Sequence, residues 1–147
     1  SKAVTAAMSS TSAASSNGCK KKLQERMRLP RRNEMREKAM REVILAQLGA
    51  LRADAGVELV ACKDECVGDY LTGKADALAV AMQMWQSKAR IETMVSFLRE
   101  EATRNMNMAE SARLCAKDTM ARLREGAAAG YMAASRVVTE VREANKS

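Results

Sequence analysis

The chain has 147 residues, the length of one domain, and a formal net charge of +7. It contains no histidine and so lacks the commonest general base and the commonest metal ligand; the sequence predicts a non-catalytic protein without a metal site. No run of about 18 apolar residues is present, so no membrane-spanning segment is expected.

The first 55 residues divide into a tail and a basic arm. Residues 1–19 are rich in Ser and Ala, carry Lys2 as their one charge, and are predicted to form an extended tail. Residues 20–55, the basic arm, are predicted to be helical. A short helix over 19–29 should end before Pro30, and a second helix should follow over 31–53.

All of the net charge lies in the first part of the basic arm. Residues 20–41 contain ten basic and three acidic side chains, which leaves +7, so the rest of the chain is neutral. A cationic segment on a neutral body is expected to bind an acidic partner. No aromatic side chain there can stack on a base, so we expect a tether to acidic protein or to an RNA backbone. The residues expected to make this contact are Lys20, Lys21, Lys22, Arg26, Arg28, Arg31, Arg32 and Arg36.

The body, residues 56–147, is predicted to contain helices over 57–71, 76–104 and 108–143, the last as one helix or a pair. Gly56 and Gly73 are the expected helix terminators, and Gly126 with Gly130 could break the last helix. One apolar seam comprises Ala77, Ala81, Met84, Lys88, Ile91, Val95 and Leu98. A second comprises Met120, Leu123, Ala127, Gly130, Ala134, Val137 and Val141, whose small middle residues let helix axes approach closely.

These elements predict an all-α protein, with long paired helices or a small helical bundle and an extended basic N-terminal arm. Beta-branched and aromatic residues never alternate over a useful length, so no strand is expected. With four aromatic residues and 11 methionines, the body is expected to complete its burial against other chains.

The four cysteines match no zinc or CxxC redox spacing, and no disulfide framework is expected. Cys62 and Cys66 are four residues apart and would share one helix face if their segment is helical. Each cysteine is open to a plain interpretation, that of a buried core thiol or a thiol at a subunit contact.

The segment Cys115-Ala116-Lys117-Asp118 resembles the bilin attachment segment of phycobiliproteins, whose pattern is Cys-x-Arg-Asp. The resemblance implies a covalent linear tetrapyrrole (bilin) as cofactor. Cys115 would form the thioether, Lys117 would pair with a propionate, and Asp118 would accept hydrogen bonds from pyrrole N–H groups. A second candidate set, Cys62, Cys66 and Asp64, departs from the pattern by one residue.

Together with the basic arm and the helical body, this segment is similar to the phycobilisome linkers, including the γ-type linkers of red-algal phycoerythrin. The resemblance implies a non-catalytic linker or accessory subunit that joins acidic phycobiliproteins. It implies a chloroplast location, on the stromal face of the thylakoid.

Two other interpretations remain open at this point. The same arm and tail would serve a structural RNA- or protein-binding subunit of another organellar complex, such as a mitochondrial ribosome or an ATP synthase. A free-standing helical adaptor or coiled-coil dimer would use the two seams but leaves the charged arm unexplained.

Overall fold

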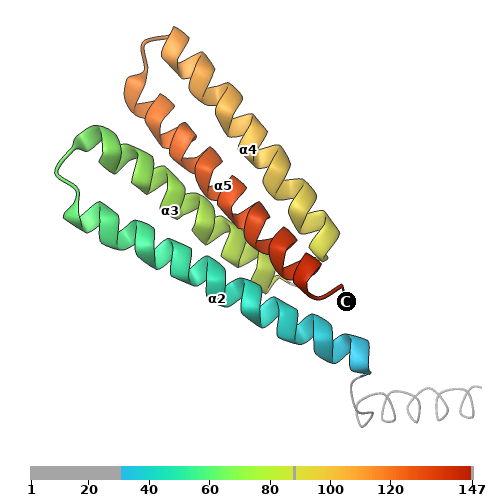
Figure 1. The fold of residues 1–147 in the computed structure, drawn as a ribbon. Helices are drawn as coiled ribbons and strands as arrows, with labels where there is room; N and C mark the ends of the chain where they lie inside the picture. Colours follow the sequence, from blue (N-terminus) through green and yellow to red (C-terminus); the bar gives the residue numbers. More distant parts are fainter. Residues whose placement is uncertain (1–30, 88, 147) are drawn as a thin grey trace, which may run out of the picture. The chain divides into compact units, whose positions relative to one another are not determined.

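The computed structural model describes residues 31–87 and 89–146. Within these ranges the chain forms four α-helices and no strand: α2 (Arg32–Ala61), α3 (Glu65–Gln86), α4 (Ile91–Leu114) and α5 (Asp118–Ala144) (Figure 1). The predicted all-α class and helical-bundle packing are confirmed. The predicted tail and the predicted short helix over 19–29 lie outside the described residues.

The chain divides into two units between Met35 and Arg36. Of the first unit, the structure describes residues 31–35, where α2 begins. The second unit spans residues 36–147 and contains α3, α4, α5 and most of α2. The predicted boundary between arm and body, after residue 55, falls inside α2, and Ile44 and Leu48 of α2 are fully buried in the core that the body residues form.

Helix α5 lies between α3 and α4 (Figure 1). Helices α3 and α5 run parallel, because Gly73 faces Leu123 and Ala127 whereas Ala77, one turn later, faces Gly130. Helix α4 returns antiparallel to α5, and α2 packs antiparallel on α3, with Trp85 near the end of α3 bonded to Arg41 near the start of α2.

The core of this unit is built mostly from aliphatic side chains at helical spacing. Helices α4 and α5 each contribute one buried face, because apolar residues recur every three or four positions. Trp85 and Tyr131 are the buried aromatic residues, and Phe97 packs edge-on against Tyr131 with ring centroids 6.5 Å apart. The largest fully buried side chains are Ile44, Leu48, Leu78, Met94, Leu98 and Val138.

Three glycines let α3 and α5 approach each other closely. A Cβ at Gly73 would strike the carbonyl oxygen of Leu123, and one at Gly126 would strike that of Tyr70. At Gly130 it would lie 2.6 Å from the carbonyl oxygen of Lys74. Any larger residue would therefore push the two helices apart. The predicted close approach along the second seam is confirmed, and α5 is not broken at Gly126 or Gly130.

The predicted helix ends were wrong in two places, because glycines that looked like terminators lie inside helices. Gly56 is within α2, and Gly73 within α3 serves the contact with α5. Helix α2 ends instead at Ala61, and Asp64 begins α3 as its N-cap.

The predicted continuous helix over 76–104 is two helices. Helix α3 ends where the backbone N–H of Ser87 donates to the carbonyl oxygens of Gln83 and Met84, and the Ser87 hydroxyl donates to Met84 at 2.6 Å. The seam residues described on either side of this break are buried or packed against the core nonetheless. In the second seam Met120 is an exception, because it is about half exposed.

Candidate functional site

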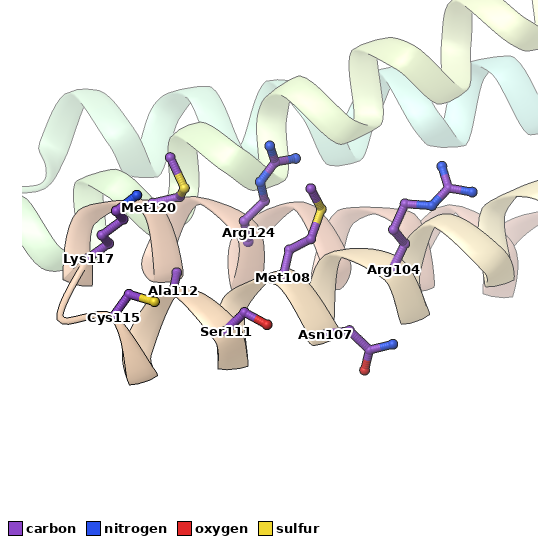
Figure 2. A pocket seen from close by; sticks show the side chains of 9 residues that line it. All are labelled: Arg104, Asn107, Met108, Ser111, Ala112, Cys115, Lys117, Met120 and Arg124. Carbon is purple, nitrogen blue, oxygen red and sulfur yellow. The ribbon is translucent and has the colours of Figure 1, made fainter.

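A groove of about 400 Å³ lies at the junction of α4 and α5, where the sequence placed its first candidate site. Figure 2 shows Cys115 on the α4 side and Lys117 with Met120 on the α5 side. We call it the Cys115 groove. It is lined by Arg104, Asn107, Met108, Ser111, Ala112, Cys115, Lys117, Met120 and Arg124.

The turn between α4 and α5 fixes the positions of Cys115 and Lys117. The N–H of Lys117 donates to Ala112 O at 2.8 Å, and the N–H of Ala116 donates to Arg113 O at 3.0 Å. This pair of bonds is the Schellman motif that ends many helices, with Ala116 at the position that usually holds glycine. Ala116 accordingly has a φ of 58°, in the left-handed region. Cys115 is thus the C-cap of α4. The sequence had suggested instead that it lies inside a helix.

The Cys115 groove is cationic. Arg104, Lys117 and Arg124 line it, and no carboxylate does. Arg104 pairs with Glu101, and Arg124 donates to the buried amide oxygen of Asn105 at 3.2 Å. Among the described residues Lys117 has no ion-pair partner. With exposed methionines beside these cations, the groove suits an anionic group attached to an apolar one.

The thiol of Cys115 is exposed, as is that of Cys66, and Cys62 is half-buried. The interpretation of these three cysteines as buried core thiols is therefore wrong. Cys115 and Lys117, predicted to act together, do line one groove.

Asp118, the third member of the predicted set, does not line the Cys115 groove. It lies in the first turn of α5, where a carboxylate stabilises the helix dipole, and close to Arg122. A hydrogen bond from Arg122 to Asp69, at 3.1 Å, raises the pKa of the guanidinium, and Cys66 and Asp118 add to the increase. The structure therefore places Asp118 with Cys66 around Arg122, and Cys115 with Lys117 in the groove.

The second predicted set is divided by the start of a helix. Cys62 follows α2, whereas Cys66 is in the first turn of α3, so the two thiols do not share one helix face. The Asp64 side chain accepts the N–H of Cys66 at 2.8 Å, and the Cys62 thiol donates to Asp64 O at 3.1 Å. Asp64 thus has a structural role as N-cap, and no member of this set lines the Cys115 groove.

The predicted partner contact is described only in part. Arg31, Arg32 and Arg36 are exposed, and no ion pair within the described part of the chain involves them. Lys20, Lys21, Lys22, Arg26 and Arg28 lie outside the described residues. The last cation of the charged segment, Arg41, is instead half-buried and bonded within the second unit.

Sequence reasoning missed Arg104 and Arg124 as members of the Cys115 groove. A signal for the α4 side was present, because residues 104, 108, 111 and 115 are spaced by four, three and four and therefore share one helix face. Arg124 had no such signal, since it comes from the partner helix.

Among residues 31–87 and 89–146, no group of three His, Cys, Asp or Glu side chains could hold a metal ion. Over the same ranges no helix is long and apolar enough to cross a membrane. No protein-family model, curated protein or solved structure matches the chain.

Proposed function

We propose that the chain is a non-catalytic linker or accessory subunit of a larger assembly, and that its basic arm attaches it to an acidic protein surface. The observation that carries this proposal is the segregation of charge. Residues 20–41 hold the whole net charge of +7 and the rest of the chain is neutral, while the described residues within 36–146 fold as a helical body. The described cations Arg31, Arg32 and Arg36 are exposed and have no ion-pair partner among the described residues. They would attract an acidic surface over about 8 Å at physiological salt.

An RNA backbone is the alternative partner, because it presents the same charge. The proposal favours protein because no aromatic side chain accompanies the cations of residues 20–41. The candidate assembly is the phycobilisome, with phycobiliproteins as the acidic partners, on the strength of the resemblance at residues 115–118.

The experiment compares the full chain with a variant in which the eight predicted contact cations of the arm are changed to Gln. Each is purified from source cells together with its bound partners. The complex is treated with RNase, and the partners that stay bound and those that are released are identified by mass spectrometry. We expect acidic proteins to co-purify with the unaltered chain, to resist RNase, and to dissociate as salt rises. The arm variant should lose them.

A matched control neutralises exposed cations of the body, Lys63, Arg90 and Arg99, and should keep the same partners. If RNase released the partners, the RNA alternative would replace the proposal. Equal loss in the control would show that overall charge, not the arm, makes the contact.

A bilin on Cys115 is a narrower proposal. The exposed thiol and Lys117 fit the attachment of a pigment that carries propionates, whereas Asp118 does not line the groove and does not fit the role of the pyrrole acceptor. Zinc-enhanced fluorescence of the denatured chain on a gel tests for the pigment. A fluorescent band that Cys115→Ser abolishes would support it, and a dark band from natively purified chain would exclude it.

A further inference from the structure

A second groove runs along α5 between α3 and α4 and shares Asn107 of α4 with the Cys115 groove. It has a volume of about 910 Å³. Tyr70 and Lys74 of α3 form one wall, Met106 of α4 belongs to the other, and Ala129 and Met132 of α5 lie along its floor, with Arg136 at the rim. We call it the α5 groove, after the helix that lies between α3 and α4 in Figure 1.

The floor of the α5 groove is apolar and is formed largely by small side chains. Ala128 is buried, and Ala129 and Ala133 are half-buried, so small side chains leave room for another backbone to approach. Met106 is 55% exposed and Met132 42% exposed, unusually open for such apolar side chains. Flexible methionines are well suited to cover the apolar side of a docked helix.

The length of the groove suits a short helix. It extends on α5 from Glu125 to Arg136, twelve residues, which span about 16 Å at the rise of an α-helix. About three turns of a partner helix would fit along it, with apolar anchors at i, i+4 and i+7.

The rim of the α5 groove carries uncompensated positive charge. Glu125 is the one carboxylate that lines it, and this side chain is paired with Arg113. Lys74 and Arg136 have no ion-pair partner within the described part of the chain. An occupant that brought carboxylates beside its apolar face would neutralise both cations.

We propose that the α5 groove binds an amphipathic helix of a partner protein, with acidic residues flanking its apolar face. This inference deepens the proposed function, since it adds a second contact with an acidic partner. It does not use the basic arm, so the two contacts can fail separately.

Methyl NMR of the full chain labelled at the methionine methyl groups tests the site directly. The probe is a synthetic amphipathic peptide of about 15 residues with Leu at i, i+4 and i+7 and Glu on both flanks. We expect it to shift the methyl signals of Met106 and Met132 in a saturable manner. Met35 precedes the second unit, so its methyl signal serves as the reference for peptide that binds elsewhere on the chain through charge alone.

Charge exchange supplies the control. The double variant Lys74→Glu, Arg136→Glu should bind the acidic peptide roughly tenfold more weakly, as read from Met106 and Met132. It should gain binding of the matched peptide in which every Glu is Lys. A variant with the eight arm cations changed to Gln should keep the Met106 and Met132 shifts, even if it loses its partners in the co-purification experiment.

Three outcomes would overturn the inference. The peptide could leave Met106 and Met132 unshifted while moving other methyl signals. The double variant could bind both peptides as the unaltered chain does. The two signals could also shift with protein concentration alone, which would make a second copy of the chain the occupant.

Discussion

Trp85 and Arg41 make two different contacts with each other. The indole Nε1 of Trp85 donates to the carbonyl oxygen of Arg41 at 2.9 Å, and the guanidinium of Arg41 lies 4.9 Å from the centroid of the indole ring. Arg41 Nη2 also donates to Ala89 O at 2.8 Å, in the turn between α3 and α4. One side chain of α2 is thereby joined to the end of α3 and to the turn that follows.

Replacement of Arg41 by Gln should therefore destabilise the fold by about 1–2 kcal/mol, through loss of the cation–π contact and of the bond to Ala89. Urea unfolding followed by the fluorescence of Trp85, the one tryptophan, measures the change. Arg36→Gln removes an exposed cation from the same helix and should change stability by less than about 0.5 kcal/mol. Equal effects of the two variants would contradict the contact.

Gly126→Ala tests the close approach of α3 and α5. A Cβ there meets the backbone of Tyr70, which cannot move aside as a side chain can. We expect a loss of about 2–3 kcal/mol and a melting temperature lower by about 5–10 °C. Gly56→Ala is the matched control, because a Cβ at Gly56 meets nothing within 4 Å. It should stabilise α2 by about 0.5–1 kcal/mol, and calorimetry would separate the opposite signs.

Ala116→Gly should stabilise the protein by about 1 kcal/mol. Ala116 occupies the left-handed region at a φ of 58°, a conformation that costs an alanine about 1–2 kcal/mol and a glycine little. Part of this gain is offset by the greater freedom of glycine in the unfolded chain. The same change at Ala50, an exposed alanine inside α2, should instead destabilise by about 1 kcal/mol. A destabilised Ala116→Gly variant would rule out the turn described.

Tyr131 should make the fold sensitive to alkali. Its burial raises the pKa of the phenol above the ordinary value of 10. The contribution to stability is thus fully present below about pH 10 and is lost as pH rises from there through the folded-state pKa. Tyr131→Phe should reduce the fall of stability above pH 10, measured by urea unfolding across pH. An alkaline profile that is unchanged in Tyr131→Phe would contradict this link.

The Cys115 groove should accelerate reaction of its thiol with anionic reagents. Lys117, Arg104 and Arg124 line the same groove, so a negatively charged disulfide reagent is attracted more than neutral iodoacetamide. We expect the ratio of the two rates at Cys115, measured by mass spectrometry, to fall several-fold in Lys117→Gln and at high salt. Cys66, which does not line the groove, is the internal reference; an unchanged ratio at Cys115 would remove the electrostatic role of the groove.

The all-α class could be predicted because apolar residues recur at helical spacing along the whole body. The seam from Leu123 to Val141 was also correct, since small residues repeat there every three or four positions. Helix ends were less predictable. Gly73 carries the same local signal as a terminator, and only its contact with Leu123, from a distant helix, explains why the helix continues.

At the candidate site, the sequence predicted that one pair of residues would lie together, but it did not predict the other residues that line the groove. Cys115 and Lys117 line the same groove, because the motif holds them two residues apart. Asp118 does not line it, since the chain turns at the left-handed Ala116 and Asp118 begins α5. The alanine at this turn gives no sequence signal of the kind that a glycine would. The α5 groove had no signal either, because three helices contribute to it.

The parallel arrangement of α3 and α5 has a consequence for the order of events as the chain leaves the ribosome. Tyr70 and Gly126 touch across the glycine contact, yet the whole of α4 lies between them in sequence. The hairpin of α2 with α3 can form early, but the side of α3 that will receive the glycines stays uncovered until α5 has been synthesised. A nascent chain that stops within α4 therefore exposes to chaperones the face of α3 that α5 buries in the finished protein.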